Sequence, residues 1–115
     1  MLTDRSDEPS WQPFRCDVVP DRAVVRVEPS GELDLATVEQ VRGHILELLD
    51  AGFATVHLDL GRLTFLDSSG LRMILEARMH AAGLGSRLSV HPGPPGVQRA
   101  FELAGMTELV FDRLN

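Results

Sequence analysis

The chain has 115 residues, of which 43% are hydrophobic, 24% charged and 5% aromatic, so it has the size and composition of one globular domain. Its formal net charge is −6, and its eleven basic residues, all arginines, are scattered without forming a stripe, which argues against a nucleic-acid-binding surface. No apolar run approaches the roughly 20 residues that cross a bilayer, and the first residues lack the pattern of a secretory signal, so we expect a cytoplasmic protein.

The first half of the chain predicts a tail, a hairpin and a helix. Residues 1–13 are polar and contain prolines, so we expect a flexible N-terminal tail before a domain over 14–115. Alternating apolar residues over 14–18 and 23–28, separated by a turn at Pro20, indicate two hairpin strands. A helix follows the bend that ends at Asp34, and its predicted core positions are Leu35, Val38, Val41, Ile45, Leu48 and Leu49. Asp34 or Thr37 is expected to cap this helix, and Thr37 with Gln40 has capping-box spacing.

The second half continues the alternation of strands and helices. Residues 55–60 alternate as a strand, and the apolar run 63–66 indicates a buried strand end. A second helix, ending at Gly83, has predicted core residues Leu71, Met73, Ile74, Leu75 and Met79. A strand over 87–90 precedes a third helix with predicted core residues Val97, Ala100, Phe101 and Ala104, and 109–111 is a possible last strand. These elements predict an α/β fold: a mixed β-sheet of four to five strands with helices packed against it.

The segment Asp67-Ser68-Ser69-Gly70 lies where the buried strand end meets the second helix. Aspartate and serine are common N-cap residues, and capping alone explains their presence there. A phosphate on Ser68 would face the free N–H groups of the helix N-terminus, so the fold would tolerate it. Because it would add nearly two negative charges beside Asp67, it would still block a docking partner.

Three elements of the chain resemble the STAS domains of bacterial anti-sigma-factor antagonists. The first is the strand-turn-helix segment over 55–75 with Asp-Ser-Ser-Gly at 67–70. The second is Gly31-Glu32-Leu33-Asp34, and the third is the C-terminal segment Phe101-Glu-Leu-Ala-Gly-Met. They occur in the family's order and cover residues 14 to 113. The resemblance implies the STAS fold.

The resemblance also implies a function and a set of site residues. An anti-sigma factor that is also a serine kinase would phosphorylate Ser68, with Ser69 as the alternative acceptor, and a serine phosphatase would reset the protein. The unphosphorylated protein would bind the anti-sigma factor and so release a sigma factor. The expected partner-binding residues are Gly31, Glu32, Asp34, Asp67, Ser68, Ser69, Gly70, Leu71 and Arg72.

Arg72 departs from the family pattern, in which many members carry a small residue at this place. It is expected near solvent, either as an ordinary solvated arginine, as a partner for a phosphate on Ser68, or as a determinant of partner choice. A constitutive STAS interaction, scaffold or transporter-accessory module without phospho-switching is the alternative function. The oligomeric state stays open between a monomer and a weak dimer.

Other chemistry-bearing residues do not form recognisable sites. The four histidines are dispersed without metal-ligand spacing, the chain has no lysine for a phosphate-binding Gly-Lys loop, and the lone Cys16 is typical of a buried apolar position. A serine hydrolase would need Gly-x-Ser-x-Gly, and the segment over 66–70 lacks the first glycine. We therefore expect no enzyme activity, no metal and no cofactor.

Overall fold

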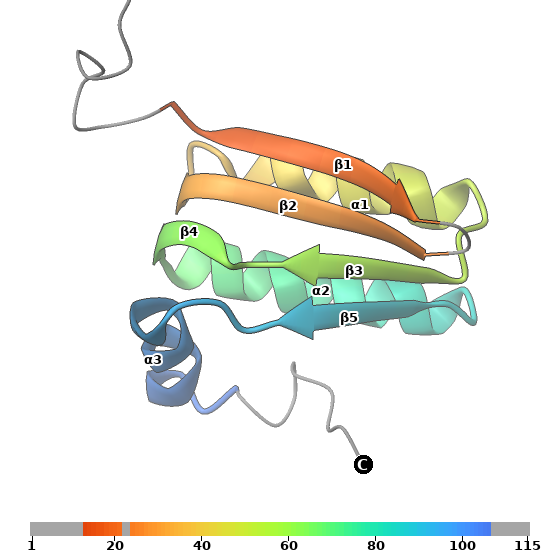
Figure 1. Cartoon of the computed structure of the whole chain (residues 1–115). Helices are drawn as coiled ribbons and strands as arrows, with labels where there is room; N and C mark the ends of the chain where they lie inside the picture. The colour runs from red at the N-terminus through yellow and green to blue at the C-terminus, as the bar shows by residue number, and fades with distance from the viewer. Residues whose placement is uncertain (1–12, 22–23, 107–115) are drawn as a thin grey trace, which may run out of the picture.

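The computed structural model describes residues 13–21 and 24–106. Its elements are β1 (Arg15–Asp21), β2 (Val24–Leu33), α1 (Val38–Asp50), β3 (Thr55–Asp59), β4 (Arg62–Leu66), α2 (Ser68–Gly83), β5 (Arg87–His91) and α3 (Pro95–Leu103). Figure 1 shows α1 and α2 side by side behind the sheet, with α3 at the end where β4 lies. Within the described residues no helix is long and apolar enough to cross a membrane.

The five strands form one mixed sheet in the order β1-β2-β3-β5, with β4 also paired to β2. β1 and β2 form the predicted antiparallel hairpin, and the other pairs are parallel. The long strand β2 pairs first with β3, over Val24–Val27, and then with β4, over Ser30–Leu33. The predicted α/β architecture is confirmed, and the β2–β4 pairing brings the end of β2 beside the start of α2.

The core lies between the sheet and the helices α1, α2 and α3. Alternate residues of β2, β3 and β5 face it, because successive side chains of a strand point to opposite faces. α1 contributes Val38, Val41, Ile45 and Leu49, and α3 contributes Val97 and Phe101, each 3% exposed or less. Burying one such side chain stabilises the fold by about 1.5 to 3 kcal/mol. Packing against the sheet therefore fixes the positions of these helices.

Several predicted core positions are wrong. Leu35 is 77% exposed, because α1 begins only at Val38 and Leu35 lies in the preceding turn. Met79 is 67% exposed, because the buried stripe of α2 runs through Gly70, Ile74, Ala77 and Ala81 and leaves position 79 on the opposite side. Ala104 is exposed, because α3 ends at Leu103.

Two further predictions concern the ends of elements. Phe65 in the apolar run at β4 is 48% exposed, whereas its neighbours Leu63 and Leu66 are buried. Thr37 is the N-cap residue of α1, but its side chain makes no capping hydrogen bond, so the predicted capping box is absent. The predicted strand over 109–111 and residues 1–12 of the predicted tail lie outside the described residues.

Candidate functional site

The start of α2 exposes one serine hydroxyl. Asp67 is the N-cap residue: its backbone is extended, and its Oδ1 accepts a hydrogen bond from the Gly70 N–H at 3.1 Å. Ser68, the first residue of the helix, is exposed, and its side chain makes no hydrogen bond to the described part of the chain. Ser69 is half-buried. The capping role therefore belongs to Asp67, which leaves the Ser68 hydroxyl available for chemistry.

Gly70 lets the helix start lie directly on the core. A Cβ at this position would overlap the side chain of Leu66 and would lie 3.2 Å from Leu33 Cγ. Leu33 is fully buried and Leu66 is 6% exposed, so neither side chain has free solvent-side space to move into. The close approach made possible by glycine thus fixes the height of Ser68 above the sheet.

The loop that follows β2 forms the second part of the site. Thr37 Oγ1 accepts a hydrogen bond from the Asp34 N–H at 3.0 Å and donates one to the Glu32 carbonyl at 2.8 Å. Asp34 Oδ1 accepts a hydrogen bond from the Ala36 N–H at 3.0 Å. The threonine hydroxyl therefore ties the loop to the end of β2, which explains why it does not cap the helix.

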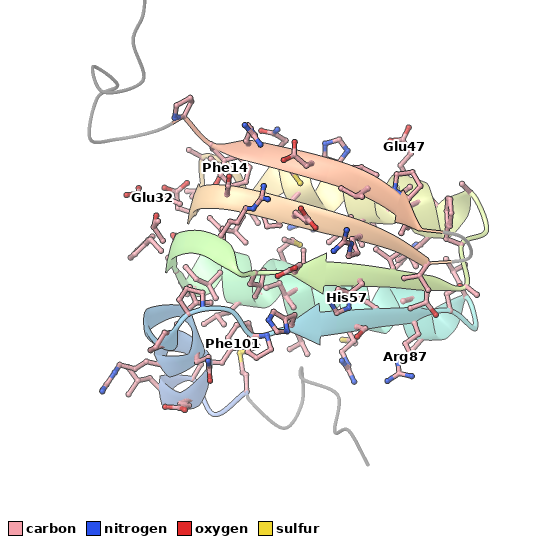
Figure 2. The ribbon with its side chains drawn as sticks, viewed as in Figure 1. Phe14, Glu32, Glu47, His57, Arg87 and Phe101 are labelled. Atoms are coloured by element: carbon pink, nitrogen blue, oxygen red, sulfur yellow. The ribbon has the colours of Figure 1, made fainter. Side chains whose placement is uncertain are left out.

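The sheet brings this loop to the start of α2. Glu32 is opposite Phe65 and Leu33 is opposite Leu66 in the β2–β4 ladder. The Asp67 N–H also donates a hydrogen bond to the Leu33 carbonyl at 3.2 Å. Figure 2 shows Glu32 at the end of the sheet where β4 lies. The two segments that the sequence singled out, some 35 residues apart, are thus neighbours.

A cavity of about 190 Å³ lies between the starts of α1 and α2. It is lined by Leu35, Val38, Glu39, Arg42, Ser68, Ser69 and Arg72. Of the predicted partner-binding residues, only the two serines and Arg72 line it. Gly31 and Glu32 belong to the neighbouring end of β2, and Asp34 belongs to the loop that follows it. Leu71 is only 8% exposed, so its side chain packs in the core.

The pattern of the sequence predicted no role in the site for the lining residues Leu35, Val38, Glu39 and Arg42, or for the half-exposed Phe65. Leu35 looked like a core residue because it fits the helical spacing, and Glu39 and Arg42 look like ordinary solvated charges. Only the packing of α1 beside α2 places Leu35, Glu39 and Arg42 around the cavity that contains Ser68.

Two histidines of the sheet lie near one another. His57 Nδ1 lies 3.2 Å from Ser89 Oγ, and the His57 and His91 rings are 6.3 Å apart. Over residues 13–21 and 24–106, no group of three histidine, cysteine or acidic side chains has the arrangement to hold a metal ion. Burial, aided by the charge of Asp17, raises the pKa of the Cys16 thiol to about 11, which fits an unreactive, partly buried residue.

The chain belongs to the STAS domain family: the family model described as "Mlab, STAS domain" matches residues 16–111. The chain is 30% identical over 79 residues to BtrV of Bordetella bronchiseptica, and the match covers 69% of this chain and 68% of that protein. BtrV is named provisionally as an anti-sigma factor antagonist. It is 28% identical over 100 residues to an anti-sigma F factor antagonist of Lysinibacillus sphaericus, covering 86% and 85% of the two chains.

A solved relative supports the same fold. The unphosphorylated form of the anti-sigma factor antagonist SpoIIAA superposes with a TM-score of 0.69 at 28% identity, covering 90% of each chain. The phosphorylated form of the Bacillus SpoIIAA gives a TM-score of 0.64 at 26% identity, covering 90% of this chain and 92% of that one. The family identification from the sequence is thus confirmed.

Proposed function

We propose that this chain is an anti-sigma-factor antagonist that is switched off by phosphorylation of Ser68. Its unphosphorylated form binds an anti-sigma factor of the serine-kinase type, which then releases its sigma factor. Family membership and the names of its relatives support the antagonist role. The single observation that carries the switch is the exposed hydroxyl of Ser68 at the start of α2, which makes no hydrogen bond to the part of the chain that the structure describes. In this role the protein binds and is modified, and it catalyses no reaction itself.

The partner surface combines apolar and acidic groups around this serine. Leu35, which is 77% exposed, lines the cavity beside Ser68 and follows Asp34 in the chain. Phe65, which is 48% exposed, is opposite the predicted contact residue Glu32 in the β2–β4 ladder. Covering large exposed apolar side chains with a partner lowers the free energy and so favours binding. The surface therefore offers a partner an apolar anchor surrounded by polar contacts, as protein interfaces commonly do.

Phosphorylation changes this surface while leaving the fold in place. The kinase transfers the γ-phosphoryl group of ATP to Ser68 Oγ; the hydroxyl proton is released and ADP leaves. The product carries about 1.5 to 2 additional negative charges at neutral pH. It lies at the N-terminus of α2, where the free N–H groups and the dipole favour an anion. A serine phosphatase would hydrolyse the phosphate and restore the binding form.

The test uses the purified full chain and the kinase-type anti-sigma factors encoded in the same genome. We expect Ser68→Ala to bind its partner at all times, and Ser68→Glu to bind weakly while remaining folded by circular dichroism. Ser69→Ala is the matched control, one residue away, and it is expected to retain both ATP-dependent phosphorylation and release. Intact mass with site mapping follows the phosphate directly.

Three results would contradict the proposal or its reasoning in different ways. Phosphorylation and release that persist in Ser68→Ala would move the switch to another residue, with Ser69 the first alternative. Tight binding to the partner with no phosphate incorporated under any condition would instead identify a constitutive STAS interaction module. Failure of Ser68→Glu to fold would contradict the argument from the helix N-terminus.

A further inference from the structure

Two arginines from different helices line the cavity that contains Ser68. Arg42 of α1 is already held by carboxylates: its Nη1 lies 3.2 Å from Glu76 Oε1, and its Nε lies 3.4 Å from Glu39 Oε1 without making a hydrogen bond. Arg72 of α2 is exposed and makes no ion pair to any residue in the described ranges. The cavity therefore holds one engaged cation and one available cation beside the serine.

The spacing of Ser68 and Arg72 brings their side chains to the same face of α2. Residues four apart on a helix are neighbours, with about 5 to 6 Å between their Cβ atoms. The order is also favourable, because an anionic group N-terminal to a cationic one at this spacing stabilises a helix. Both residues lie in the first turns of α2, which runs from Ser68 to Gly83.

Guanidinium groups are well matched to phosphate. Their planar N–H groups can donate two parallel hydrogen bonds to phosphate oxygens, and such charge-assisted bonds are stronger than neutral ones. Arg42 lines the same cavity from α1, so it can approach a phosphate on Ser68 from the side opposite α2. A serine hydroxyl offers neither arginine an anionic partner.

We propose that Arg72 captures a phosphate on Ser68, with Arg42 as a second donor from α1, so that phosphorylation closes the groove between the two helices. This inference rests on the proposed function, because it takes Ser68 as the phosphorylated residue. The phosphate then occupies the cavity and pairs with the Arg72 guanidinium, which is no longer available to a carboxylate of a partner. Partner release follows from loss of this cation and of the open groove, in addition to the repulsion between like charges.

The test introduces phosphoserine at position 68 during translation, so that no kinase is needed. The second pKa of the phosphate, ordinarily about 6, is measured by a ³¹P NMR titration of the full chain. We expect Arg72→Gln to raise this pKa by about 0.5 to 1 unit relative to the phosphorylated protein with Arg72, because a nearby cation favours the dianion. Arg42→Gln is expected to raise it less, because Arg42 is shared with Glu39 and Glu76.

The matched control is Arg87→Gln, which removes the same charge at the opposite end of the sheet, as Figure 2 shows. It is expected to leave the phosphate pKa unchanged. Equal shifts in Arg72→Gln and Arg87→Gln, or no shift in either, would overturn the proposal, since only net charge or solvent would then set the pKa. If the phosphoserine protein does not fold, the carboxyl introduced by Ser68→Glu is titrated by ¹³C NMR, and the same pattern of shifts decides.

This design separates the inference from the proposed function. If kinases never modify Ser68 in cells or in vitro, the proposed function fails although the installed phosphate is captured by Arg72. If Ser68 is phosphorylated and releases its partner but Arg72→Gln leaves the phosphate pKa unchanged, the switch stands and the arginine capture fails.

Discussion

The same substitution, glycine to alanine, should have opposite effects at Gly70 and Gly43. Both glycines are helical, Gly70 in the first turn of α2 and Gly43 within α1. At Gly70 the new methyl group would overlap Leu66 and crowd Leu33, whereas at Gly43 nothing lies within 4 Å of it. The two variants therefore separate the steric requirement at the site from intrinsic helix propensity.

The magnitudes follow from two opposing contributions. Overpacking a buried position typically costs about 1 to 3 kcal/mol. Alanine is favoured over glycine inside a helix by up to about 1 kcal/mol, with a smaller gain in the first turn. We expect Gly70→Ala to lower the free energy of unfolding by about 1 to 2 kcal/mol and Gly43→Ala to raise it by up to about 1 kcal/mol. For a domain of this size, each kcal/mol shifts the Tm by roughly 4 °C.

Urea unfolding followed by far-UV circular dichroism measures both variants. A double variant tests the assigned cause: Leu66→Val shortens the side chain that the new methyl group meets. If that contact is the source of the destabilisation, the double variant loses less stability than the sum of the two single variants. A Gly70→Ala protein as stable as the parent, with Gly43→Ala stabilised as expected, would refute the close-approach argument for this glycine.

Further predictions concern the loop, the thiol and the core. Thr37→Val removes the hydroxyl that bonds the Asp34 N–H and the Glu32 carbonyl, and it is expected to lower the unfolding free energy by about 1 kcal/mol in urea titrations. Cys16, with its thiol pKa raised from 9.0 to about 11, is expected to hold about 100-fold less thiolate at pH 8 than in 8 M urea, and iodoacetamide labelling rates measure this. Because the pKa of this thiol is raised in the folded state, its contribution to the free energy of unfolding is present below pH 9 and is lost as pH rises from 9 to 11. Unfolding measured across this pH range for the parent and for Cys16→Ser checks the sign. Phe101→Ala, at a fully buried position, is expected to lower the unfolding free energy by about 3 to 5 kcal/mol, whereas Leu103→Ala, 79% exposed, should change it little.

The local pattern of the sequence was sufficient for the elements and the family. Period-two alternation over 55–60 and the helical spacing from Val38 to Leu49 depend on which face of an element is buried, and that periodicity is visible in one dimension. The Asp67-Ser68-Ser69-Gly70 turn likewise combines a capping residue with a glycine within four positions. Such short-range chemistry survives in the sequence because it depends on neighbours in the chain.

Predictions of buried residues failed just outside the ends of helices and on the solvent-facing side of a helix. Leu35 fits the spacing of α1, but hydrogen bonds from Thr37 and Val38 to the Asp34 carbonyl place it in the turn before the helix. Met79 is apolar, but the arc of α2 that faces the sheet is occupied by other residues. An exposed apolar residue has no local mark that separates it from a buried one.

The sequence by itself determined the strand and helix order, the family and the serine at the start of α2, since each of these depends on residues close together in the chain. Only the tertiary structure decided what surrounds that serine. The parallel pairing of β4 with β2 sets Glu32 opposite Phe65, and the packing of α1 beside α2 sets Arg42 and Arg72 around one cavity. These contacts join residues some 30 positions apart through the order of the strands, and the periodicity of a single chain carries no information about that order.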